Sequence, residues 1–319
     1  MVSNAAAARA RRGIPVLREA LAEGRAGGAP QVPTTHHVTE RPAQVDALVG
    51  HDGWRPDDLL VINGGDGSVQ HALTVLLAHC PPERLPRLAC LPGGTTNMTA
   101  HDLNAHRRFG QCAETLRRAV AGQLPAAPRR VVRVQADTGP ARCGLFFGIG
   151  TIVQGIEYFQ ARIRHNGGAH ELGAGAALVR TLWGIARHQP PFAQPLTVRL
   201  LAGGCQAFAA AGPLSVRLLL ATTLDRLFLG MRPYWGSGPG ALKATLVESR
   251  APAFVTRVPR LLRGRPDRHM TARRGYHSGR LDALTLSFAG SYTLDGELFG
   301  HADDTMGVSA TVPLRFLPL

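Results

Sequence analysis

Lysine is almost missing from this sequence. Lys243 is the only lysine among the 36 lysine and arginine residues, so the other 35 (36 minus 1) are arginine. A phosphate-binding P-loop requires a lysine within Gly-Lys-Ser/Thr, and a protein kinase requires a lysine on a strand, whereas Lys243 stands in Ala-Leu-Lys-Ala and fits neither motif. The sequence therefore excludes both of these lysine-based classes of nucleotide site.

Long apolar runs and paired cysteines are missing as well. No apolar stretch approaches the roughly 20 residues that a membrane span requires, and the first residues lack the basic and apolar regions of a secretory signal, so we expect a cytoplasmic protein. The cysteines are odd in number and form no Cys-x-x-Cys pair, which argues against a disulfide framework and a zinc site. We expect reduced, packed thiols at Cys80, Cys90, Cys112, Cys143 and Cys205.

Aromatic residues are scarce, at 6% of the chain. The net charge of +14 by itself would favour nucleic acid or an anionic membrane surface. However, genome-wide codon preference can produce an arginine bias without functional selection, and the sequence offers neither a recognition motif nor an aromatic stacking platform for nucleotides. We therefore expect no nucleic-acid partner.

A chain of 319 residues exceeds the size at which single cores stop growing, so we expect two domains. The clearest pattern begins with the apolar run Leu59 to Ile62, which predicts a buried strand of a parallel sheet. Apolar residues then recur at helical spacing, which predicts a helix after a glycine-rich loop. These helical positions are Val69, Ala72, Leu73, Leu76 and Leu77.

The same order of strand, loop and helix recurs one βαβ unit later. Leu88 to Leu91 predicts a second buried strand, and Pro92 to Asn97 predicts a second glycine loop before a weaker helix. A right-handed crossover places both loops at the carboxyl edge of the sheet. We therefore expect the two loops to face one ligand.

The remaining patterns set the domain limits. Upstream, residues 10–23 predict a helix and His36 to Thr39 a short strand, while the first strand is reduced to Val2. Leu124 to Pro128 resembles a linker. Beyond it the pattern changes to short β-like runs, interrupted by a helix predicted between Gly175 and Arg187. These runs are Arg130 to Val134, Leu196 to Leu201 and Leu284 to Phe288. We expect a nucleotide-binding α/β domain at residues 1–124 and a β-rich domain at 125–319, whose C-terminal end can return to the first domain.

The first loop, Gly64 to Ser68, combines glycines with an acid. Its backbone amides and the following helix N-terminus would offer donors to phosphate. Asp66 would repel phosphates unless a divalent cation bridged them, so the loop indicates Mg²⁺ with a nucleotide. The alternative is a plain helix start capped by Asp66 or Ser68, and for the second loop a glycine turn capped by Thr95 or Thr96.

Three segments resemble the diacylglycerol kinase catalytic family, which includes bacterial lipid kinases and sphingosine and ceramide kinases. They are Ile62 to Ser68, Leu91 to Asn97 and Leu294 to Glu297, in this order and spacing. The resemblance implies a Rossmann-like parallel-sheet nucleotide domain, as in NAD kinases and diacylglycerol kinases, and a β-rich, sandwich-like lipid domain. It also implies an active site in the cleft between them, with ATP as substrate and Mg²⁺ as cofactor.

The resemblance also assigns site residues. Asp295-Gly296-Glu297 matches the acidic catalytic motif, so the catalytic residues are Glu297, Asp295 and Asp66, with Asp66 and Glu297 as the metal ligands. In an extended segment, residues two apart face the same side, so both carboxylates of the motif would point into one cleft, with Glu297 favoured as the base. An ordinary turn centred on Asp-Gly is the alternative. The nucleotide-binding positions are Asn4, Thr39, Gly64, Gly65, Asp66, Gly67, Ser68, Val69, Gln70, Gly93, Gly94, Thr95, Thr96 and Asn97.

This chain departs from the family at several positions. Met98 stands where relatives commonly carry an acid, and Gln70-His71 where a polar, often acidic pair is common. The segment Tyr234 to Gly240 occupies the loop in which many bacterial relatives carry aspartates for a structural magnesium, and it contains no carboxylate. We predict that this second metal site is missing.

The stretch from Arg257 to Arg280 contains eight arginines and one acid, Asp267. Interleaved Val258, Leu261 and Leu262 could form a basic amphipathic face for an anionic bilayer. A solvated arginine-rich loop is the alternative.

The sequence thus predicts an ATP-dependent lipid kinase of phospholipid metabolism that acts at the membrane surface. Its acceptor would be a hydroxyl of a membrane lipid of the diacylglycerol, ceramide, sphingoid base or phosphatidylglycerol class. An enzyme like NAD kinase shares the Gly-Gly-Asp-Gly loop but also carries an Asn-Glu pair, which this sequence lacks. The other alternative is a degenerate, non-catalytic lipid-binding protein. The sequence argues against it because it retains all three acids, Asp66, Asp295 and Glu297.

Overall fold

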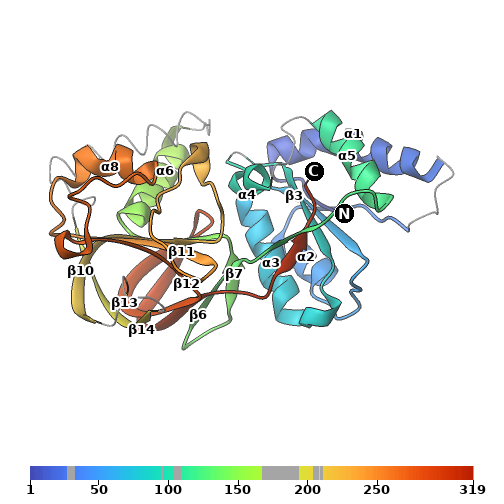
Figure 1. Ribbon diagram of the computed structural model, residues 1–319. Helices are drawn as coiled ribbons and strands as arrows, with labels where there is room; N and C mark the ends of the chain where they lie inside the picture. Colours follow the sequence, from blue (N-terminus) through green and yellow to red (C-terminus); the bar gives the residue numbers. More distant parts are fainter. Residues whose placement is uncertain are drawn as a thin grey trace. The chain divides into compact units, whose positions relative to one another are not determined.

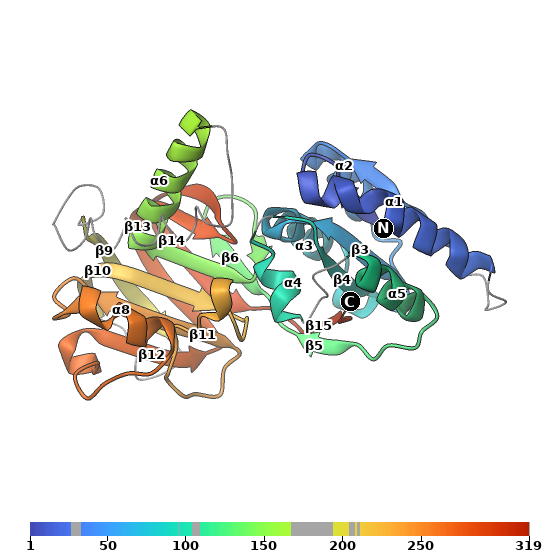
Figure 2. The same cartoon turned by 90° about the horizontal axis from the view of Figure 1, so that it is seen from above.

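The computed structural model describes residues 1–26, 33–94, 96–103, 109–166, 194–203, 208 and 211–318. The chain divides into two compact units, Met1–Arg130 with Val312–Leu319, and Val131–Thr311 (Figures 1 and 2). The C-terminal segment therefore belongs to the first unit, which also extends past residue 124.

The first unit is built on a six-stranded sheet in the order β2-β1-β3-β4-β15-β5. Neighbouring strands are parallel except for the pair β15 and β5. Its strands are β1 (Val2–Asn4), β2 (His37–Thr39), β3 (Leu59–Gly64), β4 (Arg87–Pro92), β5 (Ala127–Arg129) and β15 (Leu314–Phe316). Its helices are α1 (Ala8–Ala26), α2 (Pro42–Val49), α3 (Asp66–His79), α4 (Met98–Asp102) and α5 (Phe109–Val120), with a 3-10 turn at Pro82–Arg84.

Two apolar strands lie at the centre of this sheet. In β3 and β4 every residue after the first is buried, as expected for parallel strands covered on both faces. One core cluster joins the sheet residues Val61, Ala89 and Leu91 to α1 and α5. Helices α2 and α3 contact each other below the strands in Figure 1, opposite α1 and α5.

The second unit is a nine-stranded antiparallel sheet in the order β12-β11-β10-β8-β13-β14-β6-β7, with β9 pairing to β10 and β13. Its core is formed by apolar side chains from most of these strands, including Phe147, Phe208 and Phe288. Figure 1 shows α6 and α8 on the same face of this sheet. The strands are β6 (Val132–Ala136), β7 (Arg142–Gly144), β8 (Phe146–Gly150), β9 (Leu196–Gly203), β10 (Ala211–Thr222), β11 (Leu242–Glu248), β12 (Tyr276–Leu281), β13 (Ala283–Leu294) and β14 (Glu297–Ala310). The helices are α6 (Thr151–Asn166) and α8 (Phe254–Leu262), with 3-10 turns at Phe228–Gly230 and Ala272–Arg274.

The predicted fold class is confirmed: a parallel α/β unit is followed by an antiparallel, β-rich one. The expected linker is wrong in part, because Ala127–Arg129 forms strand β5 and pairs with β15. The helix predicted between Gly175 and Arg187 lies outside the described residues. The predicted face of α3 is buried at Val69, Ala72, Leu73 and Leu76, whereas Leu77 is partly exposed. No helix among the described residues combines the length and the hydropathy that crossing a membrane demands.

Candidate nucleotide and phosphoryl-transfer site

The first glycine loop joins β3 directly to α3. Helix α3 begins at Asp66. The residue before it, Gly65, is the N-cap in extended conformation and has no side chain that could make a capping hydrogen bond. The amides of Asp66 and Gly67 have no hydrogen-bond partner among the described residues, whereas those of Ser68 and Val69 donate to the Gly65 carbonyl at 3.0 and 3.1 Å. Unpaired amides at a helix N-terminus favour an anion such as phosphate.

The two glycine loops touch each other. A Cβ atom added to Gly94 would lie 2.3 Å from the Cα atom of Gly65. A Cβ atom added to Gly93 would lie 2.8 Å from the Gly64 backbone nitrogen and 2.7 Å from the Asn63 Oδ1 atom. Glycine is required at these positions because only the absence of a side chain permits this approach. The expectation that both loops lie at one sheet edge is confirmed.

The Asp66 carboxylate ties the second loop to the first helix. Its Oδ2 atom accepts a hydrogen bond from the Met98 amide at 3.0 Å, and its Oδ1 atom accepts one from the Thr99 amide at 2.9 Å. Asp66 is only 8% exposed. Asp66 therefore does not cap its own helix, as the simple alternative proposed, but satisfies and charge-stabilises the N-terminus of α4.

Asn97, rather than Thr95 or Thr96, ends the second loop. It is the N-cap of α4 in the left-handed conformation, with φ of 48°. Its side chain accepts a hydrogen bond from the Gly94 amide at 2.6 Å and donates one to the Gly94 carbonyl at 2.7 Å. Thr96 is exposed, and Thr95 lies outside the described residues. These reciprocal bonds join Gly94 to Asn97 within the chain itself.

Asn4 and Thr39 lie at the same sheet edge. The Asn4 Nδ2 atom donates to Ser68 Oγ at 2.9 Å, which links the end of β1 to the first turn of α3. The Thr39 hydroxyl donates to the Ser3 carbonyl at 3.3 Å and is buried. The structure thus brings the end of β1 next to the first glycine loop, as the resemblance implied.

Two of the expected nucleotide-binding residues are turned into the protein. Val69 is 2% exposed and belongs to the apolar face of α3. Gln70 is 5% exposed, and its Nε2 atom donates to the Thr74 hydroxyl at 3.2 Å. These side chains are packed among helix and core atoms, unlike the half-buried Gly67 and Ser68.

The acidic motif in the second unit forms a tight hairpin, so the predicted extended segment is wrong. Asp295 and Gly296 connect β13 to β14 with φ values of 52° and 92°. Positive φ at both central residues is the geometry of the Asp-Gly hairpin turn. The two carboxylates of the motif therefore lie on either side of a turn rather than on one face of a strand.

Asp295 is committed to the protein interior. Its carboxylate oxygens accept hydrogen bonds from the Leu145 amide at 3.0 and 3.1 Å and from the Phe146 amide at 2.8 Å. The residue is 7% exposed. The turn is thereby fastened to the start of β8, a connection that motif spacing did not reveal because the partners are backbone amides about 150 residues away in the chain.

Glu297 has the opposite environment. It is exposed at the first position of β14, and its side chain makes no hydrogen bond or ion pair with the described residues. Its backbone pairs with Leu294 across the turn. The hairpin therefore presents one uncommitted carboxylate on a backbone that the other carboxylate holds in place.

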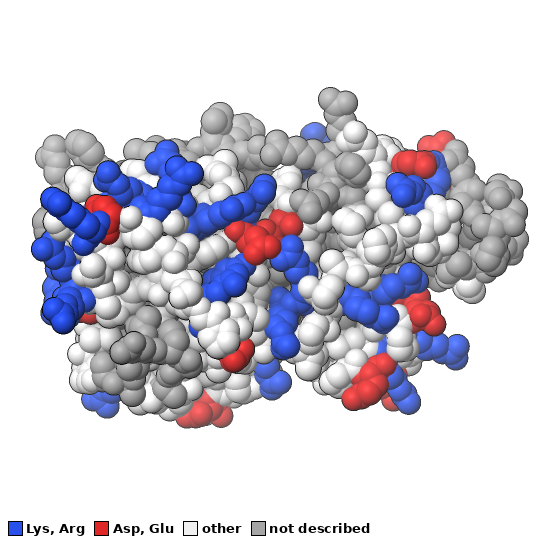
Figure 3. All heavy atoms as spheres, viewed as in Figure 1, with Lys and Arg blue, Asp and Glu red and all other residues white. Residues whose placement is uncertain are grey.

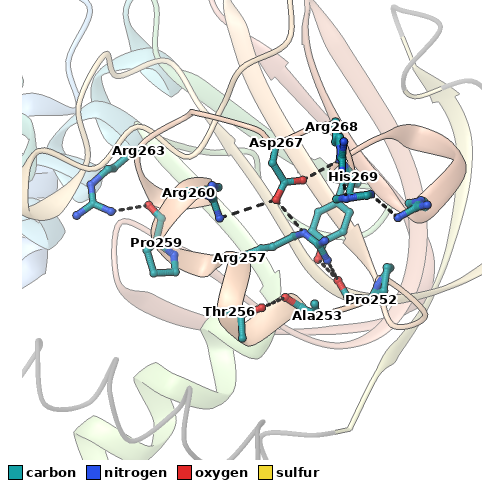
Figure 4. A network of polar contacts seen from close by, with 12 residues as sticks. Pro252, Ala253, Thr256, Arg257, Pro259, Arg260, Arg263, Asp267, Arg268 and His269 are labelled. Carbon is teal, nitrogen blue, oxygen red and sulfur yellow. Dashed lines mark hydrogen bonds and ion pairs between the residues drawn. The ribbon is translucent and has the colours of Figure 1, made fainter.

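The arginine-rich stretch also differs from the expected amphipathic face. Val258 and Leu261 of α8 are 4% and 1% exposed, and Leu262 is only partly exposed, so the apolar side of this helix packs into the protein. Arg257 and Arg260 point to the Asp267 carboxylate at 3.2 and 3.9 Å (Figure 4). Six of the seven arginines of this stretch that remain exposed form the basic surface of the second unit, where blue side chains gather in Figure 3. This basic surface consists of Arg260, Arg263, Arg265, Arg268, Arg273 and Arg274.

Solved structures with a similar fold come from proteins described as diacylglycerol kinases. A solved structure of a proposed diacylglycerol kinase from Bacillus anthracis str. Sterne superposes with a TM-score of 0.69 at 15% identity, covering 99% of this chain and 96% of that one. A second such structure gives a TM-score of 0.62 at 15% identity, with coverage of 98% and 93%. A third, of a diacylglycerol kinase from the same organism, gives 0.60 at 12% identity, with coverage of 99% and 94%. These identities show a shared fold.

No curated protein sequence matches the chain. The family model of the diacylglycerol kinase catalytic domain matches residues 22–126. This range contains both glycine loops, Asp66 and the α4 cap. The match confirms the resemblance drawn from the two glycine loops and supports a kinase: residues 22–126 resemble the diacylglycerol kinase catalytic domain.

Proposed function

We propose that this chain is an ATP-dependent lipid kinase that transfers the γ-phosphate to a hydroxyl of a membrane lipid of the diacylglycerol, ceramide, sphingoid base or phosphatidylglycerol class. The observation that carries the proposal is the contact of the two glycine loops, held by Asp66, inside a diacylglycerol kinase catalytic domain. The bonds that Asp66 and Asn97 make hold described parts of the loops in place, which lowers the entropy cost of ordering a phosphate site.

The chain's own groups suit a nucleotide with magnesium. The backbone amides of Asp66 and Gly67 would donate hydrogen bonds to phosphate oxygens. A bound Mg²⁺ would supply neutralisation of the phosphate charge, with Asp66 and Glu297 as the residues proposed to hold it. Carboxylates are its preferred protein ligands. Glu297 offers a free carboxylate, and each Asp66 oxygen retains a lone pair beyond the amide that it already accepts.

Glu297 is the residue that we assign to the acceptor. Attack by a lipid hydroxyl requires a carboxylate that removes its proton. Glu297 is exposed and uncommitted, whereas Asp295 is buried and accepts bonds from two backbone amides. The proposed base is therefore Glu297, and Asp295 is the positioning residue that holds its turn.

A phosphotransfer assay tests this function. Purified protein is incubated with γ-labelled ATP and Mg²⁺, and separately with diacylglycerol, ceramide, a sphingoid base, phosphatidylglycerol and NAD. We expect label in one of the lipids. Exclusive labelling of NAD would establish the NAD kinase alternative, and transfer to none of the acceptors would establish the non-catalytic one.

We further propose that the enzyme docks on an anionic membrane surface through its basic surface. Six exposed arginines lie close together in sequence, and the one acid among them, Asp267, is already paired with Arg257. Because the apolar side of α8 is buried, the attraction would be electrostatic rather than by insertion. Each basic residue near such a surface contributes about 1 kcal/mol.

Vesicle binding tests the docking. Replacing Arg263, Arg265 and Arg268 together by alanine should weaken binding to vesicles with phosphatidylglycerol by roughly 100-fold, since about 3 kcal/mol is removed. The matched control replaces three exposed arginines of the first unit, Arg55, Arg84 and Arg118. Equal losses in the two variants would show that only net charge matters and would refute this surface as the docking site.

A further inference from the structure

The one lysine of the chain occupies a buried position in the second unit. Lys243 lies in β11 opposite Thr222 of β10, and its side chain is 6% exposed. A buried ammonium group is costly unless it is paired and hydrogen-bonded. The surroundings of this lysine must therefore replace the water that it loses.

Three oxygen atoms from one short segment after β10 surround the ammonium group. Lys243 Nζ lies 2.5 Å from a carboxylate oxygen of Asp225, 2.9 Å from the Leu224 carbonyl and 3.5 Å from the Thr223 carbonyl. The Tyr234 ring lies on a further side, with its centroid 5.3 Å from Nζ. We call Thr223, Leu224 and Asp225 the oxygen cage.

The same cage anchors the loop that begins at Tyr234. The Tyr234 hydroxyl contacts the carbonyl oxygens of Leu224, at 3.0 Å, and of Asp225. Two backbone carbonyls and a carboxylate around one positive centre are the hard-oxygen donor set that proteins also offer to small cations. Here the positive centre comes from the chain itself, while the segment Tyr234 to Gly240 contains no carboxylate.

The choice of lysine at this position is informative because arginine fills all 35 other basic positions. An ammonium group is a compact point charge with three donors, whereas a guanidinium group is planar and presents a rigid fork. Three oxygens around a single nitrogen suit the first and not the second. The geometry of the site thus explains why lysine stands here although arginine is used at every other basic position.

We propose that Lys243 is an internal cation that does the work of a structural metal ion in the second unit, so that this unit is stable without any bound metal. The oxygen cage is then a latent cation site, which becomes open to an external cation when the lysine side chain is removed. Asp225 is half exposed and provides the path from solvent. This inference concerns stability and does not depend on the lipid-kinase proposal.

Thermal unfolding of the full chain tests the inference. We expect the wild-type Tm to be the same with EDTA and with Mg²⁺ or Ca²⁺. Lys243→Met keeps the side-chain length but not the charge, and should lower Tm by on the order of 5 °C without response to cations. Lys243→Ala should also lower Tm, and Mg²⁺, Ca²⁺ or methylammonium should restore part of the loss by entering the cage.

Two comparisons make the outcome decisive. Adding Asp225→Asn to Lys243→Ala should abolish the restoration, because the cage then lacks its charge. If Lys243→Ala does not fold, Lys243→Met and Asp225→Asn carry the test, and both should lower Tm. A wild-type Tm that falls in EDTA, a Lys243→Met variant as stable as the wild type, or a folded Lys243→Ala variant that no cation stabilises would each overturn the proposal.

Discussion

The two carboxylates that flank Gly296 differ in what surrounds them. Asp295 accepts hydrogen bonds from the Leu145 and Phe146 amides, whereas Glu297 faces solvent without a partner among the described side chains. Residues of one motif can therefore have separate roles, one in holding the backbone and one in chemistry.

Substitution of Glu297 should affect turnover and spare stability. Glu297→Gln keeps the size of the side chain but cannot accept a proton, so turnover with the lipid acceptor should fall by at least about 10²-fold. Tm should stay at the wild-type value because the carboxylate makes no bond that the fold uses. Phosphotransfer rates and a thermal melt check both parts, and unchanged turnover would place the base elsewhere.

Substitution of Asp295 should lower the stability of the fold. Asp295→Ala leaves two buried amides without acceptors, which costs about 1–3 kcal/mol of unfolding free energy. Asp295→Asn should lose less, because asparagine keeps one carbonyl acceptor and tolerates a φ of 52°. Urea unfolding of both variants measures the difference. An alanine variant as stable as the wild type would contradict the anchoring role.

At the scale of elements, the approach of the two glycine loops decides the shape of the candidate nucleotide site. Gly94→Ala would place a methyl group 2.3 Å from the Gly65 Cα atom, so the loops must separate. We expect weaker ATP binding and a lower Tm. The control is Gly110→Ala in α5, where a Cβ atom meets nothing within 4 Å and alanine favours the helix. ATP titration and thermal melts of the pair separate the two cases.

The link between β1 and the segment leading into β2 should respond to pH. Burial, together with nearby positive charges including Arg18 and His37, lowers the pKa of His36 from 6.5 to about 4, and its Nε2 atom is 2.9 Å from Ser3 Oγ. Between these pH values the unfolded chain binds a proton that the folded chain does not. Stability contributed by His36 is therefore complete above pH 6.5 and declines as the pH falls toward 4.

A His36→Gln variant tests this dependence. Glutamine keeps a polar group near Ser3 but does not titrate. The stability advantage of the wild type over the variant, measured by urea unfolding across pH 7 to 4, should shrink as the pH falls. A constant difference would show that His36 is not buried in its neutral form.

At the scale of the whole molecule, both units enclose their thiols. Burial raises the pKa of Cys90 to about 12 and the pKa values of Cys112 and Cys143 to about 11. Cys80 is buried too, and its pKa is raised by the same cause. The expected free, packed thiols are thus found at these four positions, while Cys205 lies outside the described residues.

Alkylation should consequently require unfolding. Because the thiolate is the reactive form, iodoacetamide at neutral pH should label these four cysteines far more slowly in native protein than in urea. Peptide mapping by mass spectrometry follows each site separately. Rapid native labelling of Cys90 would show that the sheet edge next to Asp66 opens readily.

Local pattern sufficed for the central strands, α3 and both glycine loops, because buried parallel strands and helix faces leave regular apolar spacing. Pattern could not show that Asp66 would cap α4, since that bond joins residues that are 32 positions apart. It also left the role of α8 open, because apolar residues at this spacing suit a membrane face and a protein core equally well.

The sequence by itself determined the fold class, the kinase motifs and the absence of a lysine-based phosphate site, because these depend on residue types and short spacings. Only the tertiary structure decided which acids are free, which way α8 faces and what the single lysine does. The local sequence Ala-Leu-Lys-Ala gives no indication of what Lys243 does. Its role becomes visible only in the fold, where β11 brings it to the oxygens of Leu224 and Asp225, because a buried charge is stabilised only by the groups that the fold places around it.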